Sequence, residues 1–484
     1  MSLKLKIGDT YATKVEASVA AETDVLVVGG GTAGCVAAIA AARNGASVLL
    51  VERYGFLGGM MTAGNAGLTM YTKFSGKPAE HEKDLKTLTK NPEEIQIVGG
   101  IVKEVTERIL RTRVGIGNSG TFGSYVFTSS EDFKWLLFRL MKESKVKLRL
   151  HSLVVDVIQN ENKIQGIVVE SKSGRQIITA KQFIDASGDG DVAVHAGVPY
   201  TVGVTKKDIC AKQATIGEMH PMGVMFKAGN VKMERTFSWL KENPENFREQ
   251  PFARFTLTEA KERFEKGEMA VINIVLKNET VAEFQIYNLP TEGVVTLCCP
   301  SVKNMDGCNV EDLTKAEIVM ADMLKQWMES IRKVPGFEKA FLLQVPEMGV
   351  RETRHIQGDY LLELMDIYKQ KKFKDCIGLG SHPIDTRPRP EWLNDPETAY
   401  PSRWYFQIPF RSLIAKTIEN LLIAGRCISA THEAFGCIRP TVQCMITGEA
   451  AGTAAAMCVK KNTKPRDLNT DELRKTLKEQ KVAL

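Results

Sequence analysis

Apolar residues gather in short uninterrupted runs, and the first runs lie close together near the N-terminus. Residues 25–28 are β-branched or aliphatic, which is typical of a buried strand in a parallel sheet. The alanine-rich sequence from Thr32 has the composition of a helix, and Asn44 and Gly45 favour its end there. A second apolar run follows at 48–51. The pattern predicts a strand, a helix and a strand within about 30 residues.

Two later apolar runs, 183–186 and 421–424, are each followed by small residues, as the first run is. Short runs between 147 and 186, separated by turn residues at 160–162 and 173–174, predict successive strands. The chain therefore repeats a strand-to-glycine junction at three places.

Apolar residues at helical spacing predict helices outside these strands. The segments are 99–110, 129–144, 256–267, 312–334 and the tail 467–484, where Asn469 and Glu472 have the spacing of a capping box. A further helix is expected to begin at about Gly448.

The composition indicates a soluble globular protein. The chain has 484 residues, of which 43% are hydrophobic and 25% charged, and its net charge of +6 is too small to indicate a nucleic-acid partner. Its N-terminus lacks the apolar core of a secretion signal, so we expect a cytoplasmic protein. The ten cysteines form no CxxC pair, and we predict no metal site.

The longest uncharged stretch, residues 25–42, has the length of a membrane helix but the wrong composition. Glycines at positions 29, 30, 31 and 34 interrupt it, and each weakens a helix by about 1 kcal/mol. Gly29, Gly31 and Gly34 instead form the GxGxxG spacing of a dinucleotide-binding turn. Glu52 ends the second strand 18 residues after Gly34, where an acid binds the ribose. We therefore predict a dinucleotide site and no membrane span.

The chain resembles the FAD-dependent oxidoreductases of the glutathione-reductase-like flavoproteins, which are related to fumarate reductase flavoprotein subunits. The resemblance is carried by the following segments: GGGTAG at 29–34 with Glu52, GFLGGMMTAG at 55–64, FIDASGDGDVAVHAGVPY at 183–200, GVRETRHIQGDY at 349–360, IPFRSL at 408–413, NLLIAGRCISATHEA at 420–434 and GEAAGTAAA at 448–456.

The resemblance implies an α/β fold in which a Rossmann-like FAD-binding domain carries an inserted α+β substrate domain. The FAD domain should have three layers, with a parallel sheet and a small antiparallel sheet. The expected parts are an N-terminal arm at 1–23, a first FAD-binding part at 24–200, a substrate or cap domain at 201–345, a second FAD-binding part at 346–465 and a C-terminal helix at 466–484.

The resemblance also assigns residues to FAD. It places the pyrophosphate on the first helix and the flavin near the C-terminal motif, where a helix opening at Gly448 would point its positive end at the ring. The predicted FAD-binding residues are Gly29, Gly31, Thr32, Ala33, Gly34, Glu52, Arg53, Gly58, Gly59, Met61, Thr62, Val154, Ala186, Ser187, Gly188, Gly425, Arg426, Gly448, Ala450 and Ala451. For Arg53 an exposed surface position is the open alternative.

Missing motifs narrow the class further. Segment 55–67 lacks the CxxxxC of disulfide reductases, and no second GxGxxG is present for NADPH. The sequence AGRC differs from the GDAAH-type motif of aromatic hydroxylases. Segment 55–64 contains no histidine for covalent flavin attachment, so we expect non-covalent FAD.

Several polar residues in the later motifs are candidates for chemistry on a substrate. His432 and Arg439 are preferred because they lie between the last strand and the expected flavin-facing helix, where related proteins place a carboxylate-binding arginine. The other catalytic candidates are Arg354, His355 and His382. Arg351, Glu352 and Arg354 could equally form a structural set of ion pairs.

The sequence predicts an enzyme that transfers a hydride between FAD and a small organic substrate. Three alternatives stay open: an NAD-dependent dehydrogenase, a tRNA-modifying FAD protein and a flavin-holding scaffold. The substrate, the electron donor or acceptor and the direction of the reaction are unknown. We expect no membrane or nucleic-acid partner, and a homo-oligomer is left open.

Overall fold

The fold was analysed in a computed structural model of the chain. It describes residues 6–7, 10, 16–64, 68–71, 73–75, 94–111, 115–117, 124–248, 256–268, 270–277, 279–382, 384–394 and 405–484, and side chains of 68–96, 115–127 and 299 are not described.

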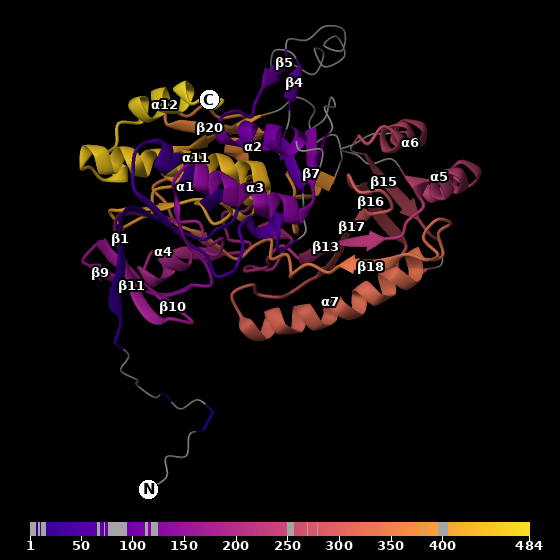
Figure 1. Ribbon diagram of the computed structural model, residues 1–484, viewed down its shortest axis with the longest axis horizontal. Coiled ribbons are helices and arrows are strands. Elements are labelled where there is room, and N and C mark those ends of the chain that lie inside the picture. Colours follow the sequence, from indigo (N-terminus) through magenta and orange to yellow (C-terminus); the bar gives the residue numbers. More distant parts are fainter. Residues whose placement is uncertain are drawn as a thin grey trace.

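The main sheet, sheet A, is mixed and lies on the left of Figure 1. Its strand order is β8-β2-β1-β11-β10-β9, and β22 also pairs with β11. The bounds are β1 (Ser18–Val28), β2 (Val48–Val51), β8 (Lys147–Arg149), β9 (Leu153–Asn160), β10 (Lys163–Ser171), β11 (Gly174–Asp185) and β22 (Leu421–Ile423). Strands β8, β2, β1, β11 and β22 are parallel, whereas β9 and β10 form an antiparallel extension.

The beginning of sheet A corrects one expected boundary. Strand β1 begins at Ser18, which is opposite Gln176 of β11, so residues 18–23 belong to the sheet and not to an N-terminal arm reaching residue 23. The predicted strand–helix–strand unit is confirmed as β1, α1 (Thr32–Arg43) and β2.

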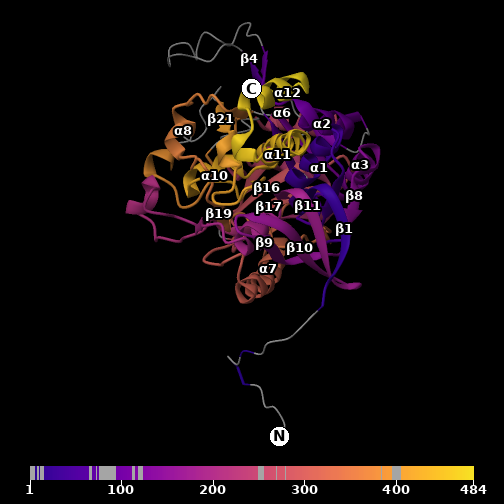
Figure 2. The same cartoon turned by 90° about the vertical axis from the view of Figure 1, so that its left-hand side faces the viewer.

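Helix α1 lies against α11 (Thr441–Lys461), a long helix from the C-terminal part of the chain (Figures 1 and 2). A Cβ on Gly448 would lie 2.2 Å from the carbonyl oxygen of Ala33, and one on Gly452 would lie 2.1 Å from that of Ala37. The two helices can approach this closely because these positions lack side chains. The expected start of the helix near Gly448 is wrong: α11 begins at Thr441, and Gly448 lies in its interior.

A second sheet, sheet F, has its own hydrophobic core and lies on the right of Figure 1. Its strand order is β14-β15-β16-β17-β13-β18, and neighbouring strands pair antiparallel. The bounds are β13 (Met222–Gly229), β14 (Phe247–Arg248), β15 (Val271–Val275), β16 (Glu283–Asn288), β17 (Val295–Val302) and β18 (Phe341–Gln344), with helices α5 (Met233–Glu242), α6 (Leu257–Glu265) and α7 (Val310–Ile331). Its core residues run from Met222 to Met348, apart from the core of sheet A.

The helices expected from periodicity are present. They are α2 (Gly100–Arg111), α3 (Ser130–Glu143), α6, α7 and α12 (Thr470–Glu479), and Asn469 caps α12 through bonds from the N–H groups of Asp471 and Glu472. The remaining elements are α4 (Asp191–His195), α8 (Leu364–Tyr368), α10 (His432–Ile438), β3 (Leu68–Tyr71), β4 (Lys73–Ser75), β5 (Glu94–Gln96), β6 (Gly115–Gly117), β7 (Ser124–Thr128), β12 (Tyr200–Val202), β19 (Arg354–Ile356), β20 (Cys376–Gly380) and β21 (Phe406–Pro409), with short 3-10 helices between them.

The predicted fold class is confirmed as an α/β protein with a parallel-rich sheet and smaller antiparallel sheets. Among the described residues, no helix is both long and apolar enough to cross a bilayer.

Candidate functional site

The turn between β1 and α1 forms a tight backbone cradle. Gly29 adopts a φ of +97°, and a Cβ there would lie 2.3 Å from the carbonyl oxygen of Ala186. A Cβ on Gly34 would lie 1.8 Å from the carbonyl oxygen of Gly29. Only glycine is accommodated at both positions, so the turn, the first helix and strand β11 are held together by close backbone contacts.

The cradle is open at Gly31, the N-cap of α1. A Cβ built on Gly31 meets no atom within 4 Å, in contrast to Gly29 and Gly34. The first turn of α1 contains no acidic residue. A helix start with free space and no competing carboxylate suits a phosphate group.

Glu52 closes one side of the cradle. It is buried, and its carboxylate accepts a bond from the N–H of Gly30 at 2.5 Å and from that of Tyr54 at 2.8 Å. Glu52 thus ties the second strand to the glycine turn. Each carboxylate oxygen has a second lone pair that can accept a further hydroxyl.

The segment after β2 packs against the turn that precedes α1. Gly58 has a φ of +110°, and its N–H donates to the carbonyl oxygen of Gly30 at 2.8 Å. A Cβ on Gly59 would lie 3.0 Å from the Cα of Gly31. Met61 and Thr62 are buried beneath this turn. Gly58 and Gly59 thus lie beside the cradle, and Thr62 lies against Gly58.

The ends of β11 and β22 form the opposite wall. Ala186 touches Gly29, and the Ser187 hydroxyl donates to the buried Asp185 carboxylate at 2.7 Å. Burial, together with nearby Asp191, raises the pKa of Asp185 to about 6. Gly188 faces the guanidinium of Arg426, which binds Asp189 at 2.6 Å.

The other predicted FAD-binding residues lie in different settings. Gly425 donates to Thr447 on α11 at 2.9 Å, and Val154 lies two residues after Ser152, whose N–H donates to the Glu52 carbonyl oxygen. Arg53 is exposed and lies over the Tyr54 ring. Gly448, Ala450 and Ala451 are buried inside α11, away from its positive end.

A buried carboxylate, Glu352, joins three distant segments. Its carboxylate accepts hydrogen bonds from Nδ1 of His432 at 2.8 Å, from Nε2 of His355 at 2.7 Å and from the backbone N–H of His220 at 2.6 Å. His432 Nε2 lies 2.9 Å from the Thr386 hydroxyl and 3.0 Å from the Pro388 carbonyl oxygen. His432 and His355 are therefore buried and bonded within the protein.

The charges in this group stabilise each other. Burial alone would raise the pKa of Glu352, but bonds from His355 and His432 lower it to about 2. Burial likewise opposes protonation of His432, but the Glu352 carboxylate raises the pKa of His432 above its usual value. His432 and Glu352 therefore form a buried ion pair.

Arg439 lies between this group and the start of α11. Its guanidinium donates to the Asp385 carboxylate at 2.6 Å and lies 3.5 Å from Nε2 of His220. His220 Nδ1 accepts the N–H of Arg387 at 2.8 Å, so a neutral ring carries its proton on Nε2. Burial first, and then the Arg439 charge, lower the pKa of His220.

Sequence reasoning missed His220 and the central position of Glu352. No local pattern marks His220, because its partners lie more than 130 residues away in the chain. Arg351 donates to the Pro221 carbonyl oxygen at 2.5 Å, next to His220. Arg351 thus contacts the backbone beside His220.

The remaining catalytic candidates, Arg354 and His382, are not bonded to Glu352 in the described structure. Arg354 pairs with Asp191 at 3.0 Å. Arg411, which lies in the segment 408–413, pairs with Asp375 at 2.9 Å, and about half of its side chain is exposed. His382 is buried beside the Asp385 carboxylate, whose pKa the adjacent Arg439 charge lowers.

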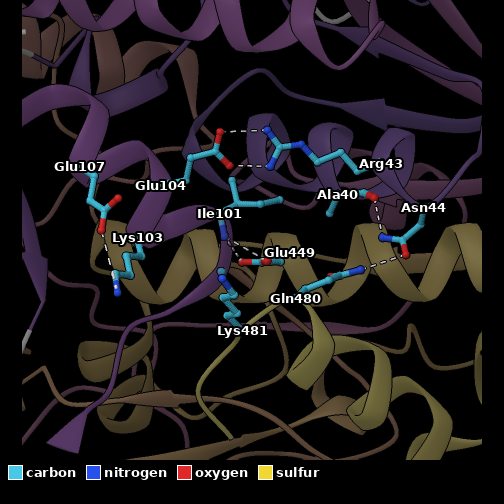
Figure 3. Close-up of a pocket in the computed structure, with 11 residues that line it drawn as sticks. Ala40, Arg43, Asn44, Ile101, Lys103, Glu104, Glu107, Glu449, Gln480 and Lys481 are labelled. Atoms are coloured by element: carbon cyan, nitrogen blue, oxygen red, sulfur yellow. Dashed lines mark hydrogen bonds and ion pairs between the residues drawn. The ribbon is translucent and has the colours of Figure 1, made fainter. Parts of the chain in front are cut away.

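A cavity of about 490 Å³ lies at the other end of α1, between that helix, α2 and α11 (Figure 3). Arg43 and Glu104 pair across it at 2.6 Å, and the buried Glu449 of α11 accepts the N–H of Ile101 at 3.0 Å. Burial raises the pKa of Glu449 to about 8. The cavity lies away from the glycine cradle, and the polar groups drawn in Figure 3 largely bond each other.

Comparison with known proteins assigns a family to these features. The sequence profile of the FAD dependent oxidoreductase family matches residues 24–477. Among curated proteins, digeranylgeranylglycerophospholipid reductase 1 of Methanopyrus kandleri is 25% identical over 228 residues, which is 46% of this chain and 56% of that protein. The match therefore spans about half the length of each protein.

Solved structures show distant likeness. A geranylgeranyl bacteriochlorophyll reductase-like protein from Thermoplasma acidophilum is 13% identical with a TM-score of 0.44, over 96% of this chain and 84% of that one. p-Nitrophenol 4-monooxygenase from Pseudomonas putida is 12% identical with a TM-score of 0.45, over 95% and 86% respectively.

Proposed function

The chain belongs to the family of FAD-dependent oxidoreductases, and we propose that it transfers a hydride between the flavin and a small organic substrate bound through an oxygen at Arg439. Bound FAD supplies the hydride chemistry. The glycine cradle, its open side at Gly31 and the Glu52 carboxylate fit the pyrophosphate and ribose of that cofactor.

The observation that carries the proposal is the pair of Arg439 with Asp385. The Asp385 carboxylate lies 2.6 Å from the guanidinium, yet its side chain is 43% exposed. Arg439 also directly precedes Pro440, the N-cap of α11. A substrate carboxylate or carbonyl oxygen can take the place of Asp385 there, near the positive end of a long helix.

His432 supports this site through other residues. Both of its nitrogens are bonded within the protein, to Glu352 and to the segment of Thr386 and Pro388. That segment follows Asp385 in the chain. His432 therefore acts as a positioning residue that holds the Asp385 loop, in place of the direct proton transfer that its sequence position indicates.

Hydride transfer to or from a substrate changes the charge on its oxygen. Among the described residues near Arg439, the neutral His220 presents Nε2–H toward the space shared with the guanidinium. This N–H hydrogen-bonds a substrate oxygen and stabilises charge that develops on it. The depressed pKa of His220 keeps the ring in this neutral form near neutral pH.

We also propose how the cofactor is held and where in the cell the protein works. FAD is held without a covalent bond, so acid precipitation should release it into a yellow supernatant. We place the protein in the cytoplasm.

The NAD-dependent alternative loses its support because the family is FAD-dependent. Binding to tRNA that falls steeply with added salt would instead favour the tRNA-modifying alternative.

The direct test is an anaerobic screen of small carboxylates and carbonyl compounds for a change in flavin absorbance. Arg439→Ala should slow the flavin reaction with a substrate found in this way by at least about tenfold, because a charge-assisted bond contributes about 1.5–3 kcal/mol. FAD content should not change. Arg411→Ala is the matched control, because Arg411 also pairs with an aspartate, Asp375, but at the surface. Equal rates in both variants would refute the role of Arg439.

A further inference from the structure

Strands β13 and β17 of sheet F place a lysine and a threonine side by side (Figure 1). Phe226 and Ala228 of β13 belong to the hydrophobic core of the sheet, so Lys227 between them points to the opposite face. Thr296 of β17 is directly opposite Lys227, and its neighbour Leu297 belongs to the same core. Residues opposite each other in an antiparallel pair share a face. Lys227 and Thr296 therefore lie together on the face away from the core.

The ammonium group of Lys227 is buried, and the groups that bond it are uncharged. The residue is 7% exposed. Its Nζ donates to the Ser130 hydroxyl, at the start of α3, at 3.0 Å and to the side-chain oxygen of Gln344 at 3.2 Å. Burial lowers the pKa of Lys227. Among the described residues, the third N–H of this group has no acceptor. Buried charges in proteins are normally paired, and this one has no bonded counter-charge.

The nearby carboxylate of Glu131 does not supply that counter-charge. Glu131 acts on the Lys227 amine through space and opposes the effect of burial on its pKa. Its carboxylate instead bonds Lys134 at 2.8 Å, and 70% of its side chain is exposed. The Lys134 charge in turn acts against protonation of Lys227. Two ammonium groups and one carboxylate therefore leave a net positive charge here.

The Thr296 hydroxyl is a second polar group whose bonding capacity is unused. The residue is 1% exposed, and its Oγ1 has no hydrogen-bond partner among the described residues. Such a buried hydroxyl is uncommon, because it has lost its hydration without a replacement bond. The Cβ atoms of directly opposed residues lie about 5 Å apart. The oxygens of one carboxylate or phosphate group can therefore accept bonds from both Thr296 and Lys227.

We propose that Lys227 and Thr296 form a binding site for an oxyanion, the carboxylate or phosphate group of a small molecule. The anion supplies the counter-charge of the ammonium group and accepts its third N–H and the threonine hydroxyl. This site is separate from Arg439, which lies beside His220. Strand β13 begins at Met222, and Lys227 is five residues further on, about 16 Å along the strand. The assignment therefore does not depend on substrate binding at Arg439.

The experiment titrates the FAD-loaded protein by calorimetry at constant ionic strength. The probes are inorganic phosphate and, separately, straight-chain carboxylates from acetate to octanoate. We expect one bound anion per chain for at least one probe. Binding of phosphate alone identifies a phosphate group, whereas affinity that rises with chain length identifies an organic acid.

Lys227→Met should weaken this binding by at least about tenfold, because an uncharged side chain of similar length removes a charge-assisted bond. Lys181→Met is the matched control, because Lys181 pairs with Asp24 at the surface of sheet A and should leave the affinity unchanged. FAD content and thermal unfolding check the fold of each variant.

Thr296→Val tests the second contact and decides the matter if Lys227→Met fails to fold. It keeps the shape of the side chain without the hydroxyl, so it should weaken binding about threefold to tenfold and unfold no earlier than the parent. Arg439→Ala should bind the anion as the parent does, which separates this site from the substrate site. The proposal is overturned if none of the probes binds, or if either Lys227→Met or Thr296→Val binds the anion as tightly as the parent.

Discussion

The glycine cradle and the Glu352 group are built in opposite ways. The cradle uses backbone: Gly29, Gly31 and Gly34 shape it, and Glu52 fastens it, all within one strand–helix–strand unit. The Glu352 group uses side chains: His432 and His355 converge on one carboxylate with Arg439 nearby, and the chain segments are far apart in sequence.

Because of this difference, the two sites should respond differently to amino-acid substitutions. At Gly29 and Gly34 the cradle tolerates no added volume, because the atoms that a Cβ would strike are carbonyl oxygens. The buried Glu352 group depends on charge, because removing one partner leaves another buried charge unpaired. Substitutions at the two sites can therefore separate the effect of volume from the effect of charge.

The largest effect is expected from Gly34→Ala. Its Cβ would lie 1.8 Å from the carbonyl oxygen of Gly29, so α1 must move away from the turn. We expect loss of FAD and a free energy of unfolding lowered by several kcal/mol, on the order of the largest core substitutions. FAD content per protein and thermal unfolding measure both.

Gly31→Ala is the matched comparison, because its Cβ would meet no atom within 4 Å. This variant should unfold within about 0.5 kcal/mol of the parent when both lack FAD, but bind FAD at least about tenfold more weakly. If Gly31→Ala keeps its FAD affinity, the pyrophosphate does not lie at this turn.

Glu352→Gln should lower the free energy of unfolding by about 3–5 kcal/mol, because it removes one partner of a buried ion pair. The Glu352 pKa is lowered from 4.5 to about 2, so its contribution is present above about pH 4.5 and lost as pH falls toward 2. The pKa of His432 is raised, so its contribution is present below its unfolded pKa and lost as pH rises through the folded value. The difference between parent and variant should therefore be largest between these limits.

Denaturant titration at several pH values tests the Glu352→Gln effect. Glu472→Gln is the control, because the Glu472–Lys461 pair lies at the surface and should contribute about 0–1 kcal/mol. A Glu352 variant no less stable than the control would show that the buried charges are not coupled.

Glu449→Gln should stabilise the protein at alkaline pH. Burial raises the folded pKa of Glu449 from 4.5 to about 8, so folding binds a proton between these values and stability falls as pH rises across them. The amide oxygen of glutamine can still accept the N–H of Ile101. We expect a gain on the order of a few kcal/mol above about pH 8 and none near pH 4.5. A difference in unfolding free energy between parent and variant that stays the same at every pH would contradict this.

The smallest effect on the fold is expected from Glu52→Ala. Loss of a charge-assisted bond to ribose, about 1.5–3 kcal/mol, should weaken FAD binding roughly tenfold or more with the fold retained. Titration of the apoprotein with FAD measures it. Because Glu52 also binds the N–H groups of Gly30 and Tyr54, a small drop in thermal stability should accompany the change.

Local patterns predicted most of the cradle but little of the Glu352 group. The positions of Gly29 and Gly34 follow from a turn whose geometry is set by adjacent residues. His220 was missed because its neighbours come from the segments around 352, 387 and 439. The start of α11 was misplaced because the glycines that indicate a turn in sequence serve helix packing in space.

The sequence by itself determined the α/β class, the dinucleotide turn and the helices, because each depends on residues within one or two turns of chain. Only the tertiary structure decided that Gly448 packs on Ala33, that His432 is enclosed by Glu352 and Thr386, and that Arg439 binds Asp385. Those contacts depend on which distant segments meet when the two sheets and α11 pack together. A pattern along the chain carries no direct information on that packing, because burial and charge pairing arise between elements and not within them.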